Sequence, residues 1–204
     1  MSEKAMKNSG AQKKTSSGFV KEIIYLAGTL LLLTAIVAGL LGYIDGITRG
    51  KILENSIRKT NEAMATLIPG AQFEEKQGLV DGTDVVRGLF EARQNGELVG
   101  VCVQAAPTGF GGEISMVVAV GRDGAVLGVQ ITRMTETAGL GSKASDPDWL
   151  NQFYGLDGGL SVVKGTAVNN GEIVALSSAT ITSVAVTNGV QQALDFARHY
   201  MEVE

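Results

Sequence analysis

The longest apolar run of the chain lies near its beginning. No charged residue occurs between Ile23 and Ile44, and Leu, Ile, Val and Ala dominate this segment. A helix of roughly 20 apolar residues crosses the ~30 Å hydrocarbon layer of a bilayer. The apolar region of a cleavable signal peptide is shorter, typically ~7–15 residues. Tyr25 and Tyr43 stand near the two ends, where membrane helices often carry aromatic residues. We therefore predict an uncleaved transmembrane helix at residues 23–44.

Polar segments flank this span. Residues 1–22 are predicted to form a cytoplasmic tail, disordered over residues 1–18 because these are polar and show no apolar period. The positive charges favour a cytoplasmic N-terminus only slightly, since five lysines precede the span and four basic residues follow it (Lys4, Lys7, Lys13, Lys14 and Lys21; Arg49, Lys51, Arg58 and Lys59). Residues 45–204 are then an extracytoplasmic domain.

Two further segments carry apolar residues at helical spacing. Residues 55–68 are predicted to be a helix that Pro69-Gly70 ends. Residues 184–200 are predicted to be a second helix on the same pattern, with Thr182 or Ser183 as its N-cap. A short helix is predicted to begin with Asp146 as cap and Pro147 at its first position.

The sequence between these helices is typical of strands. Segments 84–93 and 98–105 flank Asn95-Gly96, and segments 115–120 and 125–132 flank Asp123-Gly124. Such dipeptides favour hairpin turns. Residues 158–170 are interpreted as a further strand and turn. The predicted fold class is α+β, with antiparallel hairpins in a twisted sheet and helices packed against it.

The composition excludes several kinds of covalent and metal site. The chain of 204 residues has one cysteine, one histidine and a net charge of −4. A single cysteine excludes an intramolecular disulfide and a zinc or iron–sulfur centre held by several cysteines. The net charge indicates no broad nucleic-acid interaction. Cys102 lies among valines, which favours a buried structural thiol. Redox chemistry would have to come from a bound organic cofactor.

Hydroxyl groups gather directly before the last predicted helix. Five of the seven residues from Ser177 to Ser183 carry one. The free N–H groups and positive dipole end of a helix N-terminus suit a phosphate group. Ordinary helix capping explains such a cluster equally well when composition alone is considered.

The order of these residues, Ser-Ser-Ala-Thr-Ile-Thr-Ser, resembles the flavinylation motif of a family of FMN-binding proteins. The family comprises the G subunit of Rnf complexes and the C subunit of the sodium-translocating NADH:quinone reductase. There a threonine carries FMN through a phosphoester bond, and Thr180 is the matching position. Ser178 stands where the family usually has Gly, and Val174 where it usually has Asp.

Two glycine-rich segments resemble the same family. Residues 108–112 contain Gly-Phe-Gly-Gly, and residues 136–143 are similar to its Glu-Thr-Pro-Gly-Leu-Gly loop. Gly139 and Gly141 are expected to let the backbone approach a ligand closely. Trp149 and Phe153 are assigned either to the core or to a wall beside the flavin ring.

The chemical needs of a bound flavin ring suggest roles for particular residues. Lys143 would stabilise a negatively charged reduced ring, and Glu136 and Thr137 would orient the ring. The expected FMN-binding residues are Thr180, as the covalent attachment site, and Ser177, Ser178, Ala179, Thr182, Glu136, Thr137, Gly139, Leu140, Gly141 and Lys143.

The resemblance also implies a function. It is that of a membrane-anchored electron-transfer subunit with covalent FMN, in an ion-translocating ferredoxin:NAD+ oxidoreductase of the Rnf type, and not catalytic alone. The expected partners are the other membrane subunits of the complex and a flavin transferase. The C subunit of the quinone reductase is the alternative, which the short chain disfavours. A non-redox anchored binding or assembly module is the alternative of another class.

Overall fold

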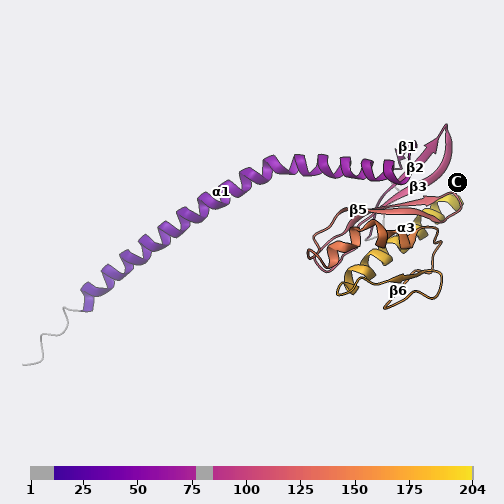
Figure 1. Ribbon diagram of the computed structural model, residues 1–204. Helices are drawn as coiled ribbons and strands as arrows, with labels where there is room; N and C mark the ends of the chain where they lie inside the picture. Colours follow the sequence, from indigo (N-terminus) through magenta and orange to yellow (C-terminus); the bar gives the residue numbers. More distant parts are fainter. Residues whose placement is uncertain (1–11, 77–84, 204) are drawn as a thin grey trace, which may run out of the picture. The chain divides into compact units, whose positions relative to one another are not determined.

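The computed structural model describes residues 12–76 and 85–203, which divide into two compact units at Asn55 (Figure 1). Helix α1 (Gln12–Leu67) forms the described part of the first unit and contributes its last turns to the second. Residues 12–18 are helical, so the prediction of disorder is wrong for them. No proline interrupts the helix there. The predicted tail residues 1–11 lie outside the described residues.

The apolar residues of α1 between Gly18 and Lys59 lack protein cover. Every residue from Gly18 to Lys59 is exposed, including the uncharged segment 23–44. Within the described ranges, α1 is the single helix long and apolar enough to cross a membrane. A bilayer gives such side chains the apolar surroundings that water does not. The predicted transmembrane helix therefore agrees with the structure, and its boundaries and orientation stay predictions.

The second unit contains a five-stranded antiparallel sheet in the order β1-β2-β3-β4-β5. Its strands are β1 (Gln72–Glu75), β2 (Val86–Gln94), β3 (Glu97–Ala105), β4 (Ser115–Gly121) and β5 (Val126–Arg133). Both predicted hairpins are confirmed, although Asp84 of the first lies outside the described residues. Asn95 and Gly96 have φ of 53° and 86°, as a tight hairpin turn with two left-handed residues requires.

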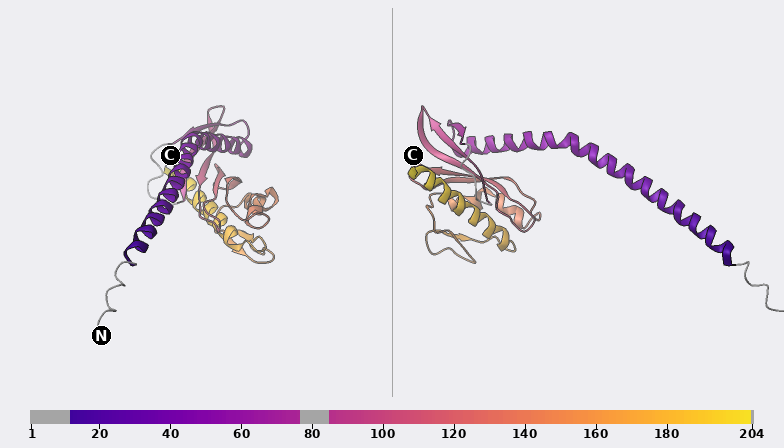
Figure 2. Two further views of the ribbon diagram at one scale, coloured as in Figure 1. Left: turned by 90° about the vertical axis from the view of Figure 1, so that its left-hand side faces the viewer. Right: turned by 180° about the vertical axis from the view of Figure 1, so that it is seen from behind.

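The sheet buries both of its faces. Helix α3 (Thr180–Val203) packs along one face, where Val101, Val103 and Val118 meet Val190 and Leu194 in one core (Figures 1 and 2). The last turns of α1 cover the other face. There Ala63, Met64 and Ile68 form a second cluster with Ala92, Cys102, Val117 and Ala119. Alternate residues of β3 and β4 thus point into different cores.

The predicted buried thiol is confirmed. Cys102 is fully buried, and burial raises the pKa of its thiol to about 12. A thiol that stays protonated at neutral pH is a poor nucleophile and metal ligand.

Short elements connect β5 to α3. They are η1 (Gly141–Ser145), α2 (Pro147–Leu150), η2 (Asn151–Phe153) and the parallel pair β6 (Ser161–Val163) and β7 (Glu172–Val174). Asp146 caps α2 as predicted, accepting a 3.2 Å hydrogen bond from the Asp148 N–H. Trp149 and Phe153 stack edge to face at 5.6 Å between ring centroids and lie in the main core. Their role is core packing, the first of the two predicted alternatives.

Candidate functional site

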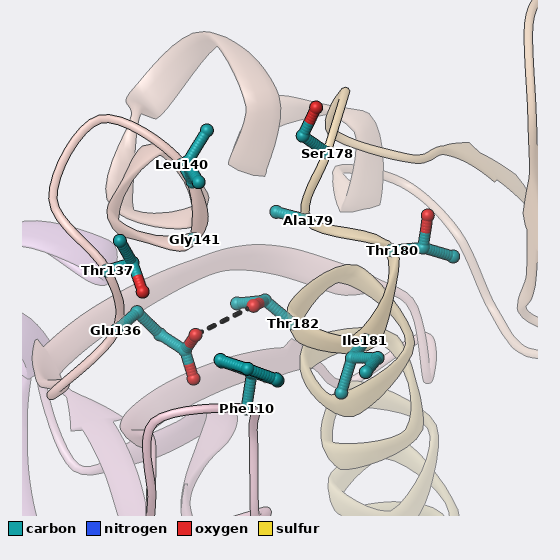
Figure 3. A pocket seen from close by; sticks show the side chains of 10 residues that line it. All are labelled: Phe110, Glu136, Thr137, Leu140, Gly141, Ser178, Ala179, Thr180, Ile181 and Thr182. Carbon is teal, nitrogen blue, oxygen red and sulfur yellow. Dashed lines mark hydrogen bonds between the residues drawn. The ribbon is translucent and has the colours of Figure 1, made fainter.

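A pocket of about 420 Å³ lies where three loops meet the start of α3 (Figure 3). Phe110 comes from the connection between β3 and β4, and residues 136–141 follow β5. Residues 178 and 179 lie in the turn before α3 (Thr180–Val203), and residues 180–182 belong to its first turn. The lining is Phe110, Glu136, Thr137, Leu140, Gly141, Ser178, Ala179, Thr180, Ile181 and Thr182. The structure thus unites the hydroxyl cluster with both glycine-rich segments.

Helix α3 begins at Thr180, four residues before the predicted start. Thr182 and Ser183 lie in its first turn, so the prediction that one of them is the N-cap is wrong. Ser183 Oγ accepts a 3.0 Å hydrogen bond from the Leu176 N–H and donates one of 3.0 Å to the Ala179 carbonyl. These contacts hold a first turn whose β-branched residues have low helix propensity.

The hydroxyl groups of this turn fall into two sets. Thr182 and Ser183 are buried, and both donate hydrogen bonds within the protein. Ser177 and Ser178 are exposed and Thr180 is half-buried. Across residues 12–76 and 85–203, the hydroxyls of these last three make no hydrogen bond. Thr180 points away from the bonded Glu136–Thr182 pair (Figure 3). Geometry therefore leaves three hydroxyls open to modification, and Thr180 is the only threonine among them.

Ser178 has an unusual backbone conformation, with φ of 65°. L-residues other than Gly, Asn and Asp rarely adopt this left-handed region, at a cost of roughly 1–2 kcal/mol. The family that the sequence resembles usually has Gly at this position. The turn before Thr180 therefore has the backbone that a glycine adopts most easily, although the residue here is a serine.

Glu136 is the most highly connected side chain of the pocket. Its Oε1 accepts a 3.0 Å hydrogen bond from the Gly111 N–H, and its Oε2 accepts one of 2.9 Å from Thr182 Oγ1. The carboxylate thereby joins the Phe110 loop to the first turn of α3. Thr135, its neighbour, donates a 2.9 Å hydrogen bond to the Gly111 carbonyl.

Glycines make room for this carboxylate. A Cβ on Gly109 would collide with Glu136 Oε1, and one on Gly141 would lie 2.6 Å from Oε2. Real Cβ atoms do not approach other atoms this closely. The sequence predicts that Gly141 lets the backbone approach a ligand closely. In the structure, the space beside its Cα is occupied by Glu136 and Thr182.

Most of the predicted binding residues line the pocket, and three do not. Ser177, Gly139 and Lys143 lie outside its lining. Gly139 forms a turn with φ of 78°, where its N–H donates a 2.9 Å hydrogen bond to Ser142 Oγ. Lys143 is exposed on η1. The structure gives no support to a charge from Lys143 at the pocket wall.

Two lining residues, Phe110 and Ile181, are absent from the predicted set. Both are apolar yet exposed, at 71% and 58%. A signal for each is present in the sequence. Glycines flank Phe110, and Ile181 falls out of phase with the apolar positions of α3 that enter the core. Exposed apolar side chains beside a pocket are typical of ligand contacts.

The lining fits a planar aromatic group that carries polar substituents. Phe110, Leu140 and Ile181 supply apolar surface, and Glu136 and Thr137 supply polar atoms. The volume falls within the range of small-molecule sites, which is roughly 300–1,000 Å³. An isoalloxazine ring, with its apolar and polar edges, meets these requirements. The open hydroxyls beside the pocket suit attachment of a phosphate ester.

Comparison with known proteins connects this site with a family. Residues 109–195 match the FMN-binding domain family, a range that holds every residue of the pocket lining. The chain is 34% identical to the G subunit of the Na(+)-translocating ferredoxin:NAD(+) oxidoreductase complex of Acetobacterium woodii, covering 85% of this chain and 91% of the relative.

Two further relatives show the same pattern. The G subunit of the proton-translocating ferredoxin:NAD(+) oxidoreductase complex of Clostridium ljungdahlii is 32% identical, over 81% of this chain and 86% of its own. The G subunit of an ion-translocating oxidoreductase complex of Methanosarcina acetivorans is 30% identical, over 86% and 95%. Among solved structures, Shewanella oneidensis NqrC has a TM-score of 0.50 at 20% identity, over 67% of this chain and 71% of that one, which is a likeness of fold.

Proposed function

The chain belongs to the family of G subunits of ion-translocating oxidoreductase complexes, and on that basis we propose that it carries FMN as a phosphoester on Thr180. It is a membrane-anchored electron-transfer subunit of an ion-translocating ferredoxin:NAD+ oxidoreductase. When bound, the flavin accepts and donates electrons. The protein holds the flavin in place and is not catalytic alone.

The choice of Thr180 as the attachment site rests on the different surroundings of the hydroxyl groups at the start of α3. Thr182 and Ser183 are buried and hydrogen-bonded, whereas Thr180 is half-buried beside the pocket. An attaching enzyme must reach the oxygen that it esterifies, so Thr180 is available and the other two are not. The positive end of the α3 dipole favours the phosphate that an ester at Thr180 would place there.

The proposed partners follow from the anchor and the family. The chain assembles with other membrane subunits of its complex, and a flavin transferase attaches the FMN. The N-terminus lies in the cytoplasm and the FMN domain on the extracytoplasmic side, as the slight excess of positive charge before the span favours. A covalent link keeps the flavin from dissociating on that side of the membrane.

Flavin fluorescence on a denaturing gel tests the proposal. The full chain is co-produced with a flavin transferase, next to Thr180→Ala and the matched control Ser177→Ala. We expect a fluorescent band for the wild type and for Ser177→Ala, because Ser177 is an exposed neighbour outside the pocket lining. The band is lost in Thr180→Ala. A dark wild-type band supports the non-redox anchored module instead.

One observation favours that second candidate. The family usually has Asp where this chain has Val174, which offers only backbone groups. Its N–H donates a 2.8 Å hydrogen bond to Gln152 Oε1, and its carbonyl accepts one of 2.8 Å from Trp149 Nε1. Val174→Asp is the variant that separates the two candidates. If the wild type is dark and this variant is fluorescent, the pocket is competent and only recognition by the attaching enzyme is lost.

Orientation has its own test, which the buried Cys102 makes possible. Introduced cysteines react with a membrane-impermeant maleimide only where that reagent reaches them, and Cys102 contributes little background. Val168 is 85% exposed in the FMN domain, and Lys21 precedes the span. We expect Val168→Cys to be labelled on intact cells and Lys21→Cys only after lysis. The reverse pattern contradicts the proposed orientation.

A further inference from the structure

Glu136 places a negative charge on the wall of the pocket, and no cation among the described residues pairs with it. Its side chain is half-buried and lines the pocket beside Phe110 and Thr182 (Figure 3). None of the ion pairs within 4.0 Å among residues 12–76 and 85–203 includes Glu136. The two groups that donate to it, the Gly111 N–H and the Thr182 hydroxyl, are neutral.

The surrounding backbone keeps this carboxylate in one place. Gly109 and Gly141 both lack the Cβ that would collide with its oxygens, and they belong to different loops. One hydrogen bond then ties Oε1 to the Phe110 loop, and the other ties Oε2 to the first turn of α3. A side chain that needs two glycines and two donors to fit is held rigidly, so its charge acts from a defined position.

We propose that Glu136 sets the reduction potential of the flavin in this pocket, by opposing the gain of negative charge that accompanies reduction. The inference rests on the proposed function, since it needs a flavin at the site. A fixed carboxylate disfavours a second negative charge nearby, most strongly where water is partly excluded. Charges near a flavin ring are among the means by which a protein tunes it. The effect is opposite in sign to the one expected from Lys143, which does not line the pocket.

Glu136→Gln removes the charge of this side chain while keeping its size and shape. The amide oxygen of Gln can still accept from the Gly111 N–H, and its NH2 group can donate to the Thr182 hydroxyl. The variant therefore keeps both contacts, with the direction of the one to Thr182 reversed, and removes the negative charge. Glu113→Gln is the matched control. It removes a carboxylate that pairs with Arg87 at 3.2 Å and does not line the pocket.

The experiment is a spectroelectrochemical titration of the full flavinylated chain and its variants. We expect Glu136→Gln to be reduced more readily, with a change on the order of tenfold in the reduction equilibrium. That factor corresponds to about 30 mV toward positive potential for a two-electron couple. The Glu113→Gln control keeps the wild-type potential.

A second variant covers the case in which Glu136→Gln does not fold. Ile181→Lys adds a positive charge at an exposed position of the same pocket and leaves the bonds of Glu136 intact. It also shifts the potential in the positive direction. An unchanged potential in both flavinylated variants overturns the role of Glu136 while leaving the attachment at Thr180 in place. A wild-type chain without flavin overturns both proposals.

Discussion

The two ends of α3 are each joined to the rest of the domain by a carboxylate, and the two carboxylates have different surroundings. At the C-terminal end, Glu91 of β2 is fully buried and accepts a 2.6 Å hydrogen bond from the Tyr200 hydroxyl. Lys76 and Arg93 pair with it at 3.2 and 2.9 Å. At the N-terminal end, Glu136 is half-buried, with neutral donors only and a pocket beside it.

The difference indicates what each carboxylate does. A buried charge that has cations and a hydroxyl around it is a structural tie, because its interactions are satisfied within the protein. A half-buried charge that has neutral donors and an adjoining cavity still acts on whatever occupies that cavity. One helix therefore has an end that stabilises the domain and an end at the pocket that we propose holds the flavin.

The largest effect on stability is expected from Glu91→Ala. The change removes the acceptor of three side chains from a buried position, and we expect a loss of about 3 kcal/mol in the free energy of unfolding. Urea titration of the full chain in detergent measures it through the fluorescence of Trp149, the only tryptophan. Glu113→Ala, at an exposed ion pair, changes the free energy by less than about 0.5 kcal/mol. Equal losses in the two variants would remove the contrast between a structural carboxylate and a surface one.

A fall in pH should weaken the contacts that Glu91 makes at the C-terminal end of α3. Burial raises the pKa of Glu91, but hydrogen bonds from Tyr200, Arg93 and Lys76 outweigh it and lower the pKa from 4.5 to about 2. Because the folded-state value is the lower one, this stabilisation is complete above pH 4.5 and is lost as the pH falls toward 2. The loss amounts to about 3 kcal/mol.

Unfolding experiments across this pH window check the size of the effect. We expect Glu91→Gln to lack most of the decline that the wild type shows, since it has no carboxylate to protonate at this position. An identical decline in the two chains would assign acid sensitivity to other groups.

Gly141→Ala perturbs the N-terminal end of α3, where Glu136 bonds to Thr182. The new methyl group would lie 2.6 Å from Glu136 Oε2 and 2.8 Å from Thr182 Oγ1, so the bond between these two groups cannot keep its geometry. Overpacking of this kind costs about 1–3 kcal/mol. Urea titration should show a smaller cost in a Glu136→Ala background, where one of the two obstacles is absent. Additive effects of the two substitutions would mean that Gly141 does not serve Glu136.

The smallest expected effect is a gain, from Ser178→Gly. Glycine adopts the left-handed backbone of this position without strain but loses more entropy on folding. We expect a net stabilisation of about 0.5–1 kcal/mol in the urea titration. A loss of stability would show that the turn before Thr180 is not strained.

Local chemistry makes part of this fold predictable from the sequence. Asn95-Gly96 predicts its hairpin because both residues adopt positive φ readily, and Asp146-Pro147 predicts its helix start by the same kind of local rule. The short edge strand β1 and the parallel pairing of β6 with β7 depend on distant partners, so no local pattern predicts either. The predicted start of α3 is too late because contacts of Ser183, rather than propensity, stabilise its first turn.

Part of the candidate site, too, can be predicted from the sequence, and part of it cannot. Resemblance to known motifs predicts the hydroxyl cluster and the Glu136 loop, and both contribute residues to the pocket lining. The bond between Glu136 and Thr182 joins residues 46 positions apart, so no local pattern indicates it. The role predicted for Lys143 depends on its charge alone, and its exposed position on η1 lies outside the pocket lining.

The most direct test of the account is peptide mass spectrometry of the full chain after co-production with a flavin transferase. We predict that the peptide containing residues 177–183 carries the mass of FMN and that fragmentation places it on Thr180. The same peptide found without FMN, or with FMN on Ser177 or Ser178, would contradict the assignment of Thr180 as the point of attachment.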